Sequence, residues 1–162
     1  MKNFILLALA LLVIACQSKT EPEVVVKTAK AEYIKKLYNA FAEGDVETVM
    51  AGFTEDIQWN EAENFIYSDG NPYVGGGAIG EGVFARLGSE WEYWNLENIQ
   101  FFNVDTSMVL VTGRYNALNK GSGKELDAQF AHLWTLGDSL ASSFQQYTDT
   151  KQAAEVVVVE MD

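Results

Sequence analysis

Apolar and polar residues alternate with period two along QFAHLWTLGDSLASSFQQYTDT, which covers residues 129–150. The alternation holds on both sides of Gly137-Asp138-Ser139 and predicts a half-buried hairpin that turns at those residues. Residues opposite each other in a ladder point to the same face of a sheet. Pairing the strands about this turn predicts one inward face, made of Phe130, His132, Trp134, Gln145, Tyr147 and Asp149.

Two strand patterns precede this hairpin, over residues 91–104 and 108–118. The two strands of the hairpin itself are predicted over residues 125–136 and 140–148. Short turns between successive strands predict an antiparallel meander. The tail Glu155–Glu160 is compatible with an added edge strand or with a frayed end.

Helical spacing dominates the first half of the chain. Residues 27–43 place Ile34, Leu37, Tyr38 and Phe41 on one side, and residue 44 is a glycine, where a helix commonly ends. Asp45 is a suitable N-cap for a short second helix. Helices followed by a strand meander predict an α+β domain with the helices packed on one face of a curved sheet.

The segment 59–74, WNEAENFIYSDGNPYV, has no clear period and predicts a strand end followed by a loop that could cover a pocket. Residues 75–80 match the pattern G-x-G-x-x-G, which occurs in dinucleotide sites. No βαβ unit surrounds this match, so we expect a loop that leads into a helix instead.

The N-terminus combines Lys2 with an apolar run from Phe4 to Ala15 that ends Val13-Ile14-Ala15-Cys16. This pattern is typical of a secretory signal, because the run is too short to span a bilayer. The ending resembles a bacterial lipobox, which implies lipidation of Cys16 and a lipid anchor in the membrane of the cell envelope. The predicted divisions are a signal at 1–15, a tether at 16–27, a domain at 28–154 and a tail at 155–162.

The net charge is −12, and loss of Lys2 with the signal gives −13. Such acidity argues against nucleic acid as a partner. Cys16 is the sole cysteine and His132 the sole histidine, so the sequence predicts no disulfide, no transition-metal site and no cofactor.

The order of these elements resembles the SnoaL-like, ketosteroid isomerase-related branch of the nuclear transport factor 2-like superfamily. The resemblance covers residues 27–154 and rests on Gly44-Asp45, Asp56–Trp59, Asn71–Gly75, Phe130–Trp134 and Gln145–Thr150. It implies a cone-shaped curved sheet around a long helix, a deep pocket and often a homodimer. Members include isomerases, cyclases, hydrolases, lyases and proteins that only bind ligands, so the resemblance leaves the chemistry open.

In the enzymes of this group, a carboxyl group in an apolar cavity moves a proton next to a carbonyl. His132 and Glu61 are the residues that we expect to share such a role here, since Glu61 lies two residues after Trp59 and faces the same side of a strand. Tyr147 or Gln145 would donate a hydrogen bond. The expected apolar walls are Trp59, Phe65, Tyr73, Phe130 and Trp134.

Asp149 is a further acid in the hairpin, although it lies about 13 Å along the strand from His132 if His132 pairs with Gln145. It is equally suited to cap a short helix over residues 151–154. Three functions remain open from the sequence: a cofactor-independent enzyme, a non-catalytic pocket for a small apolar ligand, and a module whose outer sheet face binds a protein or a second copy. The structural alternative for the aromatic residues and His132 is ordinary core packing.

Overall fold

The computed structural model describes the backbone of residues 22–158 and the side chains of residues 29–158. The predicted signal peptide and residues 16–21 of the predicted tether, Cys16 among them, lie outside the described backbone. Helix α1 spans Pro22–Ala42, so it begins within the segment 16–27 that the sequence assigned to the tether. No helix in the described part of the chain is long and apolar enough to cross a membrane.

Helix α1 is followed by α2 (Val46–Ala51) and strand β1 (Phe53–Asn60). Asp45 caps α2 as predicted, because its carboxylate accepts a hydrogen bond of 3.0 Å from the Thr48 backbone N–H. A loop with the 3₁₀ turn η1 (Ser68–Gly70) then leads to the two-residue strand β2 (Tyr73–Val74).

A continuous helical segment follows, made of α3 (Gly75–Ile79), the π-helical turn η2 (Gly80–Phe84) and α4 (Ala85–Glu90). The helix that the sequence predicted after the glycines is therefore present, and its residues Ile79 and Val83 are buried. The preceding strand β2 is short and antiparallel to β1, so the glycine-rich segment lacks the βαβ surroundings of a dinucleotide site.

The rest of the chain is β3 (Trp91–Asn103), β4 (Met108–Asn119), β5 (Glu125–Leu136), β6 (Ala141–Thr148) and helix α5 (Thr150–Val157). One six-stranded sheet has the order β2-β1-β6-β5-β4-β3, and only β1 and β6 pair in parallel. The meander from β3 to β6 and the predicted α+β class are therefore confirmed.

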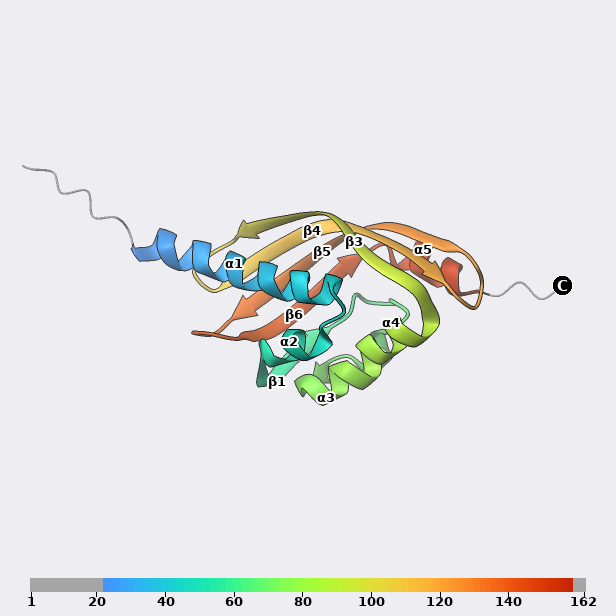
Figure 1. The fold of residues 1–162 in the computed structure, drawn as a ribbon, viewed down its shortest axis with the longest axis horizontal. Helices are drawn as coiled ribbons and strands as arrows, with labels where there is room; N and C mark the ends of the chain where they lie inside the picture. The colour runs from blue at the N-terminus through green and yellow to red at the C-terminus, as the bar shows by residue number, and fades with distance from the viewer. Residues whose placement is uncertain (1–21, 159–162) are drawn as a thin grey trace, which may run out of the picture.

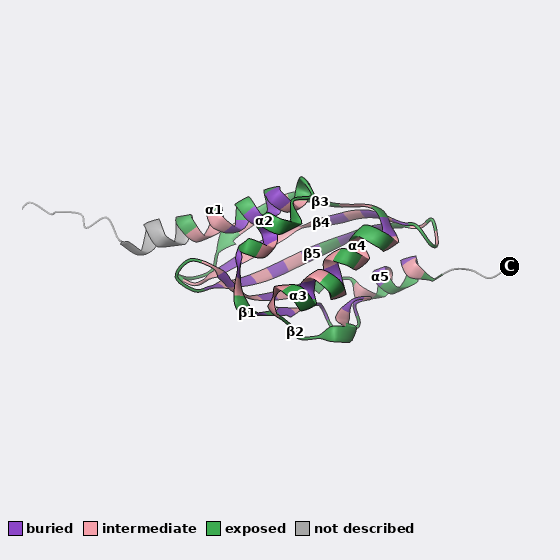
Figure 2. Cartoon of the chain, turned by 60° about the horizontal axis from the view of Figure 1, so that its bottom comes forward, coloured by how far each residue is buried: buried purple, intermediate pink, exposed green. Residues whose placement is uncertain are grey.

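Helices α1, α2, α3 and α4 lie on one side of the curved sheet (Figure 1). Buried positions alternate along β4 and β5, and α1 carries buried residues as well (Figure 2). The hydrophobic core is formed by these residues between the helices and the sheet. Helix α5 packs at the far end of the sheet, with Ala153 and Val156 buried. The tail up to Val157 is thus helical rather than an edge strand.

The predicted face of the last strand is wrong by one residue. The structure pairs Phe130 with Thr148, His132 with Gln146 and Trp134 with Phe144. The cause is an irregularity beside the turn, where Thr135 pairs with Ser143 but Leu136 pairs with Ala141. Because side chains alternate, this extra residue turns Phe144 and Gln146 inward and Gln145 and Tyr147 outward.

Candidate functional site

A cavity lies between the helices and the inner face of the sheet. It has a volume of about 70 Å³, and about 10–15 Å³ measured in this way holds one water molecule. Its lining residues are Leu37, Tyr38, Phe41, Val49, Trp59, Glu61, Phe65, Tyr67, Val83, Phe84, Leu87, Trp94, Leu96, Tyr115, His132, Trp134, Phe144 and Gln146. The wall is mainly aromatic and aliphatic, with a few polar groups, as in many small-molecule sites.

Five of the residues that line the cavity are only partly buried. These are Phe41 at the end of α1, Phe84 and Leu87 on the η2 and α4 segment, and Trp94 and Leu96 on β3. A ligand as large as benzene fills a cavity of about 150 Å³ in a well-studied case. Side chains of the lining would therefore have to rotate to admit a ligand of that size.

Glu61 is the acidic residue of the cavity, and it is 3% exposed. Its Oε1 accepts a hydrogen bond of 2.6 Å from Trp59 Nε1, while Oε2 is buried and has no partner among the described residues. Burial raises the pKa of Glu61 to about 7, although the Trp59 bond and the charge of Arg86 act in the opposite direction. The carboxyl group can therefore lose or gain a proton near neutral pH.

The backbone of Glu61 is fixed by Asn71, which lies across the loop. The Asn71 side chain accepts a hydrogen bond of 2.9 Å from the Glu61 N–H and donates one of 2.7 Å to the Glu61 carbonyl. Gln146 holds the next residue, since its Oε1 accepts a bond of 3.1 Å from the Ala62 N–H. The position of the carboxyl group is thus set from the loop and from β6.

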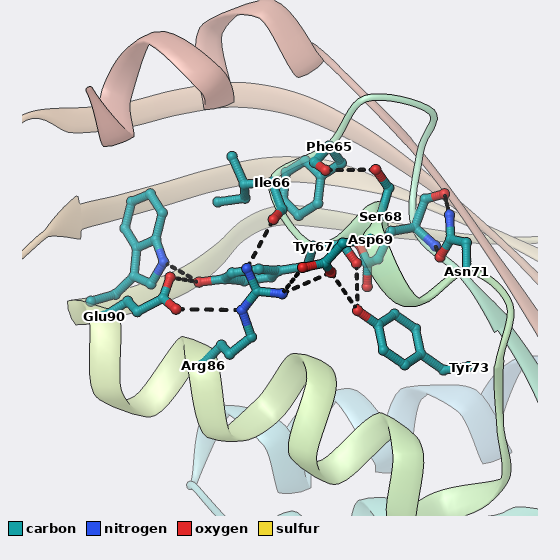
Figure 3. Close-up of polar contacts among 11 residues, drawn as sticks. Phe65, Ile66, Tyr67, Ser68, Asp69, Asn71, Tyr73, Arg86 and Glu90 are labelled. Atoms are coloured by element: carbon teal, nitrogen blue, oxygen red, sulfur yellow. Dashed lines mark hydrogen bonds and ion pairs between the residues drawn. The ribbon is translucent and has the colours of Figure 1, made fainter.

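Arg86 of α4 holds the other half of this loop (Figure 3). Its guanidinium group donates to Asp69 at 2.9 Å and to the Ile66 carbonyl at 3.0 Å, and lies 4.1 Å from the centre of the Tyr67 ring. The Tyr67 hydroxyl in turn donates to Glu90 at 2.8 Å. Arg86 therefore ties the covering loop to α4.

His132 is also buried in the cavity wall, but both of its ring nitrogens are occupied by tyrosines. Tyr38 Oη lies 2.6 Å from Nδ1, and Tyr115 Oη lies 2.6 Å from Nε2. Phe130 stacks on the imidazole with ring centres 4.2 Å apart. Burial lowers the pKa of His132 to about 3, so the ring is neutral at ordinary pH.

The sequence analysis assigned His132 and Glu61 a shared proton-transfer role, and in the structure no hydrogen bond joins the two side chains. Neither nitrogen of His132 is free, and Glu61 is bonded to Trp59 instead. The two groups line one cavity, as the sequence predicted, but each is held by other side chains.

Trp59, Phe65 and Trp134 line the cavity as expected. Phe130 is buried behind the imidazole, and Tyr73 is buried beneath the loop, where its hydroxyl donates to the Tyr67 carbonyl at 2.8 Å. Neither of these two residues is part of the cavity lining.

Tyr147, Gln145 and Asp149 do not reach the cavity. Tyr147 is 54% exposed on the other side of the sheet, because the bulge in the hairpin reverses its direction. Gln145 Nε2 donates to the Gln146 carbonyl. Asp149 caps α5, with its carboxylate 3.0 Å from the Gln152 N–H, and so has the structural role that the sequence left open.

The polar residues that the sequence hypothesis missed are Tyr38, Tyr115 and Gln146. Tyr38 was placed on the inward side of its helix but without a role. Tyr115 stands at an inward position of the alternating pattern of β4, between Val111 and Ala117. Gln146 was predicted to face away from the cavity, because no residue in the turn indicates that the hairpin contains a bulge.

No cluster of three or more histidine, cysteine or acidic residues suited to a metal occurs among the described residues. The polar groups of the cavity are one carboxyl, one imidazole, one amide, tyrosine hydroxyls and tryptophan indole N–H groups. These groups can exchange protons and donate hydrogen bonds.

Solved structures resemble this chain along most of its domain. An NTF2-like protein from Burkholderia thailandensis is 26% identical, with a TM-score of 0.74 over 79% of this chain and 96% of that one. Bal32a, from a soil-derived mobile gene cassette, is 21% identical, with a TM-score of 0.73 over 81% and 98%. TerC, co-crystallized with polyporic acid, is 23% identical, with a TM-score of 0.66 over 77% and 95%.

No protein-family model and no curated protein sequence matches the chain. The structural similarities define the fold as nuclear transport factor 2-like, with a curved open sheet and N-terminal helices. The predicted fold class is confirmed.

Proposed function

We propose that the cavity binds a small, mainly apolar molecule and that Glu61 moves a proton to or from it without a cofactor. The observation that carries this proposal is the Glu61 carboxyl group itself. It is buried in an apolar wall, one oxygen is fixed by Trp59, and the other oxygen has no protein partner. A buried polar atom without a partner costs about 1–3 kcal/mol, which a bound ligand would relieve.

The reaction class follows from the chemistry of this group. A carboxyl group with a pKa of about 7 is well matched to general acid or base catalysis at neutral pH. Removal of a proton next to a carbonyl is the simplest reaction that such a base performs, and isomerisation, cyclisation and elimination all begin in this way. TerC, with a similar fold, was co-crystallized with polyporic acid, which supports a small-molecule pocket as the site.

The direct test is hydrogen exchange in a small ketone. Cyclopentanone is incubated with the protein in D₂O, and the loss of its α-protons is followed by NMR. We expect exchange faster than in buffer with the wild type and loss of that acceleration in Glu61→Gln, while the exposed neighbour variant Glu63→Gln behaves as the wild type. Equal rates for the wild type and Glu61→Gln would refute the catalytic role.

The alternative is a pocket that binds a ligand without chemistry. In that case cyclopentanone binds but its α-protons exchange at the buffer rate. Lipidation at Cys16, attachment to the cell envelope and a homodimer across the outer sheet face remain further parts of this proposal, based on the sequence.

A further inference from the structure

Five side chains form one continuous hydrogen-bonded chain along the cavity wall. Its order is Trp134, Tyr38, His132, Tyr115 and Gln146, with successive distances of 3.1, 2.6, 2.6 and 2.9 Å. All five side chains line the cavity. Their hydrogen bonds can be assigned by counting the available hydrogens.

The residue at each end of this hydrogen-bonded chain donates a hydrogen bond to the neighbouring tyrosine. The Trp134 indole has only an N–H donor, so it donates to the Tyr38 oxygen. The Gln146 amide is oriented by the Ala62 N–H, which donates to Gln146 Oε1 and leaves the NH₂ group facing Tyr115. Neither end can accept a hydrogen from a tyrosine.

The three central groups then have one hydrogen too many. The Tyr38 hydroxyl, the neutral His132 ring and the Tyr115 hydroxyl each carry one hydrogen, while only two contacts join them. Each contact uses a single hydrogen. One hydrogen is therefore left without an acceptor in the chain.

The tautomer of His132 decides where this hydrogen lies. When Nε2 carries the ring hydrogen, Nε2–H donates to Tyr115, Tyr38 donates to Nδ1, and the Tyr115 hydroxyl hydrogen is free. When Nδ1 carries it, Tyr115 donates to Nε2 and the Tyr38 hydroxyl hydrogen is free. In either case the free hydrogen belongs to a buried tyrosine hydroxyl at the cavity wall.

We propose that this single free hydroxyl hydrogen is a binding group of the cavity, which donates to one acceptor oxygen of the ligand at either of two positions selected by the His132 tautomer. The inference rests on the proposed ligand-binding function and narrows the ligand to an apolar molecule with a carbonyl or ether oxygen. His132 acts as a positioning residue, because it directs the tyrosine hydrogen and does not touch the ligand oxygen through either nitrogen.

Glu61 favours one of the two arrangements. Burial is the first cause that raises the pKa of both Tyr115 and Tyr38, and the negative charge of Glu61, which lines the same cavity, adds to it for Tyr115. An ionised Glu61 attracts a hydroxyl hydrogen that points into the cavity from Tyr115. A ketone could then accept from Tyr115 while Glu61 faces its α-protons.

The test uses the carbonyl infrared band of cyclopentanone bound to the full domain. In the wild type we expect a band at lower wavenumber than that of cyclopentanone in hexane, since the carbonyl accepts a hydrogen bond. Failure of cyclopentanone to bind, or a bound band at the hexane position, would overturn the inference. This arm requires no variant and so does not depend on the folding of a mutant.

A variant pair then tests the hydrogen count. Gln146→Glu, studied at a pH where the new carboxyl group is ionised, replaces the inward donor by an acceptor that takes the free Tyr115 hydrogen. We expect the shifted band to be lost and cyclopentanone to bind roughly 2- to 12-fold more weakly, the equivalent of one ordinary hydrogen bond. Gln146→Leu removes the amide but adds no acceptor, so its band should stay shifted.

The same two variants also test which ring nitrogen of His132 carries the hydrogen. His132 is the only histidine in the chain, so ¹⁵N NMR reports it without assignment. Gln146→Glu should hold the ring with its hydrogen on Nε2, and a ring with its hydrogen on Nδ1 would contradict the count. The two experiments separate the two proposals. A shifted carbonyl band without α-proton exchange would refute only the catalytic role of Glu61. Exchange without a shifted band would refute only the tyrosine donor.

Discussion

Trp59 Nε1 donates a hydrogen bond of 2.6 Å to Glu61 Oε1, and the two residues are neighbours on one face at the end of β1. This bond anchors a carboxyl group inside an aromatic cavity without supplying a positive charge. The cost of ionisation therefore stays high, and the carboxyl group keeps its proton up to about neutral pH.

Replacement of Glu61 by Gln should change how stability depends on pH. The pKa of Glu61 is raised from an ordinary value of 4.5 to about 7, so the folded state binds a proton that the unfolded state releases between these values. The wild type should thus lose about 3 kcal/mol of stability as pH rises from 4.5 to 7. Glu61→Gln should lack this loss and be the more stable protein at pH 8.

Urea unfolding of the two proteins at pH 5 and pH 8 measures this difference. Glu63→Gln is the control, because Glu63 is an exposed neighbour in the same loop. The difference in unfolding free energy between the wild type and Glu61→Gln should change between the two pH values. An unchanged difference would show that Glu61 ionises as a solvated carboxyl group.

His132 should remain neutral far into the acid range. Its pKa is lowered from 6.5 to about 3 by burial, so the unfolded state gains a proton before the folded state does. The stability that His132 contributes is complete above 6.5 and is lost as pH falls toward 3. The ring resonances of this sole histidine should show no titration between pH 8 and pH 5, whereas a midpoint near 6.5 would indicate an exposed ring.

Tyr38→Phe and Tyr115→Phe should each destabilise the fold by about 1–3 kcal/mol. Each variant removes the partner of one buried imidazole nitrogen and leaves it unsatisfied. Tyr147→Phe is the matched control, since that residue is 54% exposed on the other side of the sheet, and it should change stability by less than about 0.5 kcal/mol. Equal effects of all three changes would argue against the tyrosine and histidine chain.

The absence of a side chain at Gly113 leaves space for the Phe130 ring, which stacks on His132. A Cβ atom at this position would lie 2.5 Å from Phe130 Cζ and 2.8 Å from the Glu97 carbonyl oxygen. Gly113→Ala should therefore cost about 1–3 kcal/mol through overpacking. Gly88→Ala in α4 meets nothing within 4 Å and should be neutral or slightly stabilising. Thermal unfolding of both variants checks this contrast.

The elements of the fold follow directly from local patterns. Residue alternation located β5 at its observed bounds of Glu125–Leu136, and helical spacing placed Ile34, Leu37 and Tyr38 toward the core. The Asp45 cap was also predictable, because it depends on neighbouring residues only. Such features are fixed within a few residues of chain.

The site was predicted less completely, because it depends on pairing across the sheet. Glu61 was found from its spacing to Trp59, which is a local relation. Gln146 was missed because one bulged residue beside the turn exchanges the faces of β6. The bonds of Tyr38 and Tyr115 to His132 join residues 94 and 17 positions apart, and no local pattern specifies them.

The most direct test of the central claim is the titration of the Glu61 carboxyl group itself. ¹³C NMR of protein labelled at glutamate Cδ follows each carboxyl group with pH, and the Glu61 signal is the one absent from Glu61→Gln. We predict a midpoint of about 7 for this signal. A midpoint near 4.3, the value of a solvated glutamate, would contradict a buried acid and base in the cavity.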